Sequence, residues 1–459
     1  MSMQLRMTIL AAATASALSG GCALRPAPDV EEVQARALPG VSTPAQWRSH
    51  GAQPGQIQER WLLAFNDATL NALVEEALAH NPDLQASAAR VAQAAAFVES
   101  ASASLFPQLS ALGNSSGKST GGGGLNYGGL FASWELDVWG RVRAGREAAQ
   151  LQLLSAELAD QYARQSLAAM VARAWFLASE ARLQQGLAQE MVKSAEALVR
   201  LNQERARVGV GNDYDIALAR ASLASYRDVA AQMDLAWRQS VQAIETLVGR
   251  YPAAELEVPA SLPRLSGPVP AGLPSELLER RPDVVAAERR VASAFYLVEE
   301  AKAARLPTLS LNGSGSTLSS DLILLKERDD WVWGYGGRVV APLYLGGSLQ
   351  AQIKLRTAEQ EEAVADYGRA GAAAFADVEN ALASSSALQE REPLLATAVS
   401  ESQQALKVAE TRYRVGSADL RSVQQQQLQL AAAKTSLLRV QSEQLVQRVN
   451  LYLALGGSF

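Results

Sequence analysis

The chain has 459 residues, 48% of them hydrophobic, which is ample apolar material for a buried core. Its 42 lysines and arginines are outnumbered by 47 aspartates and glutamates, and the net charge of −5 argues against nucleic acid as a partner. Two histidines, His50 and His80, and one cysteine, Cys22, leave almost nothing for metal binding, thiol chemistry or a histidine-based triad, so we expect no enzyme activity and no cofactor.

The N-terminus has the features of an export signal. Arg6 precedes an apolar stretch, Met7 to Leu18, which is too short to cross a bilayer as a helix. Leu18-Ser-Gly-Gly-Cys22 resembles a bacterial lipobox, although the leucine lies four residues before the cysteine instead of the usual three. We expect Cys22 to be acylated and to anchor the protein to a membrane. The alternative is ordinary signal cleavage that leaves Cys22 unmodified.

The rest of the chain contains an internal duplication. Asn81-Pro-Asp-Leu84 recurs as Arg281-Pro-Asp-Val284, an offset of 281 − 81 = 200 residues, and Arg207-Val-Gly209 recurs as Arg414-Val-Gly416 at an offset of 207. One insertion of about seven residues in the second half explains the change. The expected segments are a signal peptide (1–21), a lipidated segment (22–66), a first repeat (67–265) and a second repeat (266–459).

Each repeat is expected to open with a helix and a strand pair, followed by one very long helix and a shorter returning helix. The first long helix is expected over about Val142–Val208, whose 67 residues lack proline and would extend about 100 Å. The second, about Ser348–Val415, contains Pro393, which aligns with Gly186, so we expect a bend or loosening in both. The remaining expected segments are opening helices at about Pro82–Ser104 and Pro282–Ala304, returning helices at about Asp213–Gly249 and Asp419–Leu455, and a proline-rich, non-helical stretch at about Arg250–Pro282.

Alternating apolar and polar residues predict two hairpins of strands. The alternation is clear over 130–139 and 331–345, and partner strands are expected at 103–112 and 306–315, with long loops at 113–124 and 316–330. About ten residues per strand, and aromatic residues at strand ends, suit a bilayer. A solvent-exposed sheet is the alternative. The side chains expected to face lipid include Trp134, Leu136, Trp331, Trp333 and Tyr335.

Four strands are too few to close into a barrel, and open sheet edges are unstable in lipid. Several copies must therefore pool their strands, and three copies would supply twelve. The expected fold is mainly α with a small β part, with four transmembrane strands per protomer, and the family resemblance given next implies a homotrimeric 12-strand β-barrel.

Three sequence blocks identify the family that the chain resembles. The first runs from Trp61-Leu-Leu-Ala-Phe-Asn-Asp67 to Leu84, the second is Trp134-Glu-Leu-Asp-Val-Trp-Gly-Arg141, and the third ends the chain at Leu451–Phe459. In this order and spacing they resemble the outer membrane factor family of TolC/OprM-type, NodT-like efflux lipoproteins, over essentially the whole mature chain. The resemblance implies a trimer with a long-helix α-barrel in the periplasm below the strands. It also implies a lipid-anchored position in the outer membrane, a periplasmic adaptor, and an inner-membrane pump of RND, MFS or ABC type.

The same resemblance places the selective point of the duct at the two helix hairpins farthest from the outer membrane. In the first hairpin, threefold symmetry would turn Asp213 and Asp215 into rings of carboxylates that favour cations. The alternative is that these aspartates cap the returning helix. The turn glycines Gly209 and Gly211 are expected to end the long helix, with exposed surface around them contacting the adaptor.

The second hairpin departs from the family pattern. Gly416 forms its turn, Asp419 is its only acidic residue, and Arg421 is an added positive charge. We hypothesise that Arg421 pairs with Asp213 or Asp215 across the hairpins and holds the resting tip shut.

The leading interpretation is a passive, trimeric exit duct for drugs or other small molecules. The same fold would serve as the outer component of type I protein secretion or of metal efflux. Only Met170, Met191 and Met233 lie beyond the signal, which disfavours a methionine-lined copper or silver route. A helical structural surface lipoprotein is the third alternative, but it would not account for the amphipathic strands.

Overall fold

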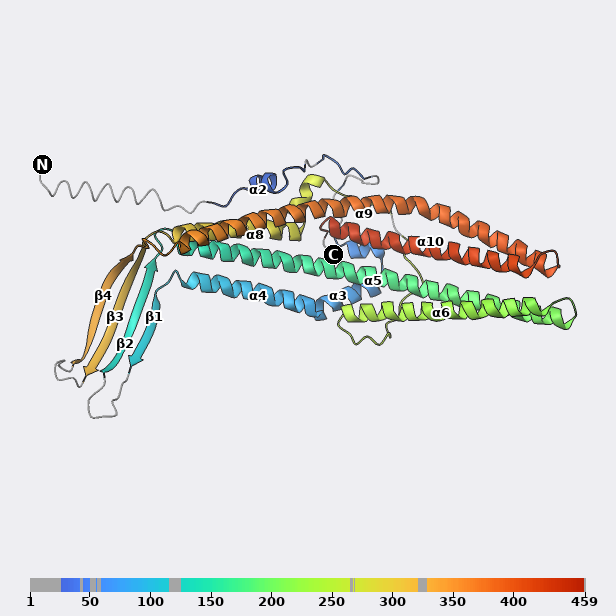
Figure 1. The fold of residues 1–459 in the computed structure, drawn as a ribbon, viewed down its shortest axis with the longest axis horizontal. Coiled ribbons are helices and arrows are strands. Elements are labelled where there is room, and N and C mark those ends of the chain that lie inside the picture. The colour runs from blue at the N-terminus through green and yellow to red at the C-terminus, as the bar shows by residue number, and fades with distance from the viewer. Residues whose placement is uncertain are drawn as a thin grey trace. The chain divides into compact units, whose positions relative to one another are not determined.

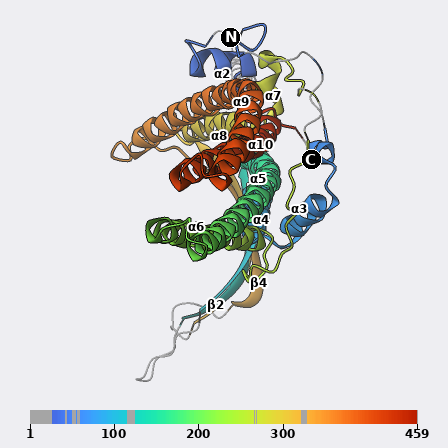
Figure 2. The same cartoon turned by 90° about the vertical axis from the view of Figure 1, so that its right-hand side faces the viewer.

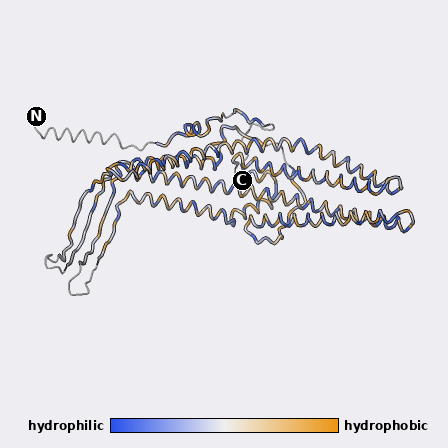
Figure 3. The backbone as a smooth tube through the Cα atoms, viewed as in Figure 1, coloured by the Kyte–Doolittle hydropathy of each residue, from blue (hydrophilic) through white to orange (hydrophobic). Residues whose placement is uncertain are grey.

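The computed structural model describes residues 26–41, 44–49, 55, 59–114, 125–264, 267, 269–320 and 328–457. Cys22 and the predicted signal peptide lie outside these residues. Hydrophilic and hydrophobic residues are mixed along the helices (Figure 3). Within the described ranges, no helix is both long enough and apolar enough to cross a membrane.

The duplication predicted from the sequence is confirmed by the elements themselves (Figure 1). Members of each helix pair have equal lengths of 22, 67 and 35 residues. The pairs are α4 (Pro82–Ala103) with α8 (Pro282–Ala303), α5 (Arg141–Arg207) with α9 (Ser348–Arg414), and α6 (Asp213–Leu247) with α10 (Leu420–Ala454). Helices α5 and α9 continue through Gly186 and Pro393, and the bend predicted there stays a prediction.

Other boundaries differ from the prediction. The strands are β1 (Gln108–Asn114), β2 (Leu125–Leu136), β3 (Thr308–Ser320) and β4 (Arg328–Val340), so the predicted loop over 316–330 is partly strand. Val138 and the residues after Val340 lie outside strands, because Asp137 engages the next helix and Pro342 has no N–H for a ladder. The stretch predicted as non-helical contains η2 (Pro274–Glu276) and α7 (Leu277–Arg280), and α2 (Val30–Ala37), η1 (Trp61–Phe65) and α3 (Ala68–His80) precede the first repeat.

The chain forms two compact units, and each draws on both repeats. One contains Ala88–Ala159 and Asp283–Gly371 with the described part of the first 41 residues, and therefore holds the sheet. The other contains Asp160–Pro282 and Ala372–Phe459 with the described part of Ser42–Ser87, and holds both helix hairpins.

The sheet is antiparallel with strand order β1-β2-β3-β4. Large apolar side chains stand out from it: Trp333 is 77% exposed and Tyr335 is 98% exposed in the single chain. The rings of Trp331 and Trp333 lie 6.2 Å apart, and Trp333 is paired with Gly315, where an added Cβ would come within 2.9 Å of its ring. Glycine therefore leaves room for an aromatic surface on this face of the sheet.

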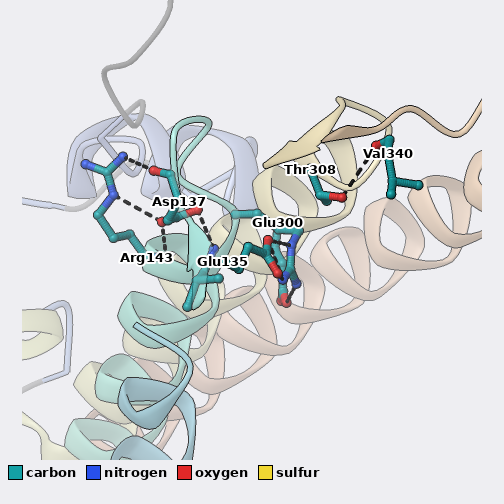
Figure 4. Close-up of polar contacts among 8 residues, drawn as sticks. Glu135, Asp137, Arg143, Glu300, Thr308 and Val340 are labelled. Carbon is teal, nitrogen blue, oxygen red and sulfur yellow. Dashed lines mark hydrogen bonds and ion pairs between the residues drawn. The ribbon is translucent and has the colours of Figure 1, made fainter. Parts of the chain in front are cut away.

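The junction between β2 and α5 is held by the carboxylate of Asp137 (Figure 4). Its two oxygens accept hydrogen bonds from the backbone N–H groups of Val142, at 3.0 Å, and Arg143, at 2.9 Å. These are free donors of the first helical turn, and a negative charge is stabilised there. Beside it, Arg141 donates to both oxygens of Glu135 at 2.9 Å. This block of sequence thus ends the strand and fixes the start of the 67-residue helix.

An aromatic core joins the N-terminal block to α5 and α10 in the unit that holds the hairpins. The ring of Trp61 stacks on Tyr452 of α10 at 5.7 Å, and Phe65 packs against Phe176 of α5 at 4.9 Å. Asp67 caps α3 by accepting from the Leu70 N–H at 3.0 Å, and its other oxygen accepts from the indole of Trp175 at 2.8 Å. One carboxylate therefore starts one helix and attaches it to another.

The chain upstream of this block is held against α9. Glu379 accepts hydrogen bonds from the backbone N–H groups of Arg48 and Ser49, both at 2.9 Å. The indole of Trp47 donates to the Ala271 carbonyl at 3.0 Å, and its ring lies 6.4 Å from that of Phe375. These contacts fix residues 47–49 against the helix.

The segment that follows α6 is fixed by a buried carboxylate. Glu245 is 3% exposed and accepts hydrogen bonds from the backbone N–H groups of Ala254 and Glu255 at 2.7 Å and of Leu256 at 3.0 Å. Ala254 has a φ of 58°, a left-handed conformation that is unfavourable for alanine. The Glu245 contacts therefore maintain a strained turn.

We predict that Glu245→Gln loosens this turn, because the amide places N–H groups against backbone donors. The loss is about 1–3 kcal/mol, or one to two orders of magnitude in local opening. Limited proteolysis of the purified protein would measure it as faster cleavage within residues 250–264. Glu257→Gln, at an exposed position nearby, is the control and should leave the cleavage rate unchanged.

Candidate functional site at the two helix hairpins

The hairpins α5–α6 and α9–α10 lie side by side in both views (Figures 1 and 2). Each of the two long helices ends in a turn of the same type. Gly209 has a φ of 80°, its N–H donates to Ala206 at 3.0 Å, and the next N–H reaches the Arg205 carbonyl at 2.9 Å. This is a Schellman motif, in which a left-handed glycine allows the last carbonyls of the helix to be paired. Gly416, with a φ of 79°, forms the equivalent bonds at the end of α9.

Gly211 is required for a different reason. A Cβ at this position would lie 2.6 Å from the backbone nitrogen of Ala206, closer than any side chain permits. The turn therefore closes tightly back on the end of α5.

The cap of α6 is not one of the two aspartates for which capping was the alternative role. The side chain of Asn212, and not that of Asp213 or Asp215, caps α6 by accepting from the Asp215 N–H at 2.7 Å. The Asn212 amide also donates to the Asp215 carboxylate at 3.3 Å, whereas the Asp213 side chain is exposed. Asparagine is as good a cap as aspartate, so the neighbouring carboxylates are not needed for this role.

In the second hairpin Asp419 is the cap. It accepts from the Ser422 N–H at 2.9 Å and from the Ser422 hydroxyl at 2.6 Å. The hydrogen bond from the Ser422 hydroxyl has the largest effect, followed by that from the Ser422 backbone N–H. Together they hold the pKa of the Asp419 carboxyl below its usual value. Asp419 is therefore a charged helix cap at neutral pH.

Arg421 contacts a tyrosine instead of an aspartate. Its Nε donates to the Tyr214 hydroxyl at 3.1 Å, its Nη2 donates to the same oxygen, and the guanidinium lies 5.4 Å from the centre of the ring. In the described part of the chain no ion pair within 4 Å joins Arg421 to Asp213 or Asp215, so the predicted pair is not formed within one copy. The hydrogen bond with Tyr214 is the main reason that the pKa of Arg421 is raised, although the charge of Asp215 also contributes to the raised pKa.

Tyr214 and Arg421 occupy equivalent positions in the two repeats, because 421 − 207 = 214. Each is the second residue of its returning helix, after the caps Asn212 and Asp419. The tips of the two hairpins thus contact each other through residues at equivalent positions that differ in chemical type.

Below this contact lies a small core that the sequence analysis did not anticipate. Tyr413, Leu420, Val423 and Ala219 are buried together. The Tyr413 hydroxyl donates to the Asn202 side chain, and the guanidinium of Arg205 lies 4.8 Å from the Tyr413 ring. Burial raises the pKa of Tyr413. A single tyrosine in the arginine-rich end of α9 gave no periodic signal, so sequence patterning could not identify it.

Both tips also expose apolar side chains. Val208 and Val210 of the first turn are 67% and 65% exposed, and Val415 of the second is 74% exposed. Among the described residues, no group of three or more His, Cys, Asp or Glu side chains could hold a metal ion. The two turns thus present apolar side chains to solvent in the single chain.

The residues predicted to face lipid lie on the sheet of the other unit. Trp331 is 52% exposed, Trp134 is 37% exposed and Leu136 is half-buried. The Trp134 indole donates to the Leu105 carbonyl at 2.9 Å, near the strand end. Cys22 lies outside the described residues.

Comparison with known proteins identifies the family that has this fold. The model of the outer membrane efflux protein family matches residues 73–250 and 273–457. The chain is 33% identical to the pyoverdine export outer membrane protein OpmQ of Pseudomonas putida, with 92% of this chain and 93% of OpmQ covered. It is 29% identical to the cation efflux system protein CusC of Escherichia coli, with 87% and 88% covered. The solved structure of the outer membrane protein VceC from Vibrio cholerae matches with a TM-score of 0.78 at 28% identity, with 88% and 100% covered. This chain belongs to the outer membrane efflux protein family.

Proposed function

We propose that the chain is the exit duct of a tripartite efflux pump, in which three copies conduct small molecules passively across the outer membrane. The observation that carries this proposal is the sheet. In the described part of the chain, β1 and β4 are its outer strands, so each leaves one row of backbone N–H and C=O groups unpaired. The same sheet exposes large apolar side chains, including Trp333 and Tyr335.

These two properties are incompatible in a single copy. An apolar sheet face favours lipid, but unpaired backbone groups at an open edge cost several kcal/mol each in lipid. Pairing β4 of one copy with β1 of the next removes both edges. Three copies supply 3 × 4 = 12 strands, enough to surround a lumen.

The helix hairpins would form the periplasmic end of the duct. In a trimer, the exposed Asp213 and the neighbouring Asp215 would become rings of negative charge that favour cations. The exposed valines of the tips, Val208, Val210 and Val415, are suited to pack against a periplasmic adaptor. The adaptor would connect the duct to an inner-membrane pump of RND, MFS or ABC type, and acylated Cys22 would anchor the N-terminus in the outer membrane.

The cargo depends on those partners. Two relatives of this chain are named for export of pyoverdine and for efflux of cations, so proteins of this family are named for different cargo. A passive duct needs only a bore and a gate, and selection of the substrate belongs to the pump.

We predict that Tyr335→Arg reduces the amount of trimer in the outer membrane. Tyr335 is 98% exposed and the variant loses few contacts within one chain, whereas a charge on a lipid-facing strand costs up to about 2–4 kcal/mol. Heat-sensitive migration of membrane extracts on gels would measure the trimer.

Ser314→Arg is the matched control. Ser314 is paired with Gly334, one residue before Tyr335, and so lies on the opposite face of the sheet. Its charge would face the lumen and should be tolerated. Equal trimer yields from the two variants would contradict the assignment of the lipid face.

We also predict that the Tyr214–Arg421 contact is a latch of the resting state. Arg421→Ala and Tyr214→Phe should each raise the leak conductance of closed channels in planar bilayers, and the double variant should add nothing further, because both remove one interaction. Arg412→Ala, an exposed arginine on the last turn of α9, is the control. Unchanged leakage in both single variants would rule out the latch.

A further inference from the structure

A cavity of about 190 Å³ lies between the two hairpins, and all four of their helices line it. This volume is comparable to the roughly 150 Å³ of a protein cavity that accepts benzene. Most of its wall is apolar. The apolar lining consists of Leu187 and Met191 of α5, Tyr226 of α6, Leu406 of α9, and Leu430 and Ala431 of α10.

One polar atom in the wall has no partner. Gln427 is 8% exposed, and its Nε2 donates to the Ser194 hydroxyl at 3.0 Å. Its Oε1 is buried and has no hydrogen-bond partner among the described residues. Buried acceptors in native proteins are generally paired, so this oxygen is available to a donor from outside the chain, either water or a ligand group.

Gln424, one turn earlier on α10, can be compared with Gln427 in burial and hydrogen bonding. It is 9% exposed and donates to the Ser222 hydroxyl at 2.9 Å, just as Gln427 donates to Ser194. Gln424 does not line the cavity, and its oxygen is not among the unpartnered buried atoms of the described residues. The side-chain oxygens of Asn71, Asp160 and Gln165 are also buried without a partner among the described residues, and Gln427 is the member of this group that lines the cavity.

The charges around the cavity favour a neutral ligand. Glu190 and Lys434 line it and lie 3.7 Å apart, with side chains 70% and 34% exposed, so they form a balanced pair where the cavity meets solvent. Tyr226 is buried, and burial raises the pKa of its phenol, which therefore stays uncharged. No net charge is left to attract an ion.

We propose that this cavity binds a small, neutral, aromatic molecule with one N–H or O–H group, which donates to Gln427 Oε1. The ring would lie against the apolar side chains of both hairpins. A ligand that contacts all four helices stabilises the arrangement in which they are found here. The site depends on the geometry of the hairpins alone, and so goes beyond the role of the chain as a duct.

The test is calorimetric titration of the purified full-length protein with indole and with indene. Indene has the same ring shape but carries a CH₂ group in place of the N–H. Indole should bind roughly three- to tenfold more tightly than indene, because only indole satisfies the buried acceptor. In Gln427→Met the two probes should bind equally, whereas Gln424→Met should keep the preference for indole.

Ala431→Leu fills the cavity and should abolish binding of both probes, which also separates the site from partition into detergent. If Ala431→Leu does not fold, the comparison of indole with indene on the unmodified protein still decides. Absence of indole binding at millimolar concentration would show that water alone occupies the cavity. Equal affinities for the two probes, or an unchanged preference in Gln427→Met, would overturn the assignment of Gln427.

Discussion

The backbone groups at the two outer strands of the sheet are the constraint on which the rest of the account depends. One copy pairs β1 with β2, β2 with β3 and β3 with β4, and among the described residues no strand pairs with the far side of β1 or β4. The sheet nevertheless exposes tryptophan and tyrosine, which suit a membrane interface. When copies join edge to edge, the backbone groups of the outer strands become paired and the apolar face can contact lipid. The long helices attached to the strands are then brought together in the same assembly.

The duplication gives the fold two similar halves, and the differences between them lie where function is expected. The long helices and returning helices match residue for residue at the offset of 207, and Gly209 and Gly416 end the long helices in the same way. At the tips, however, tyrosine in one repeat contacts arginine in the other. A contact between quasi-equivalent positions can be tuned by changing either residue without altering the turns that present them.

The two strand-to-helix junctions differ as well. Asp137 caps α5 with a carboxylate, whereas the aligned position before α9 is Tyr344, which is 85% exposed. The first repeat therefore has a charged connection between sheet and helix that the second does not have. The physical consequence is a more firmly fixed start for α5.

The sequence predicted those features that repeat or that depend on local preference. Helix formers without proline predicted α5 to within one residue at each end, and the duplication was visible because prolines and glycines kept their register. Tertiary contacts decided the rest. Strand ends were wrong because Asp137 and the proline after β4 end the ladder, and neither effect appears as a period.

At the candidate site, residue type alone left the partners open. Arg421 was expected to pair with a carboxylate, but the geometry places the Tyr214 hydroxyl nearest. Asn212 was overlooked as a cap because two aspartates follow it. Glu245, Tyr413 and Gln427 gave no signal, since a buried polar side chain on a long helix looks like a solvated one until its neighbours are known.

The most direct test of the central claim is to count the copies in the conducting species. Native mass spectrometry of the full-length protein released from membranes, combined with current recording from the same preparation in planar bilayers, would do so. The account predicts three copies per particle and a steady ion current. A stable single copy that passes no current would contradict it.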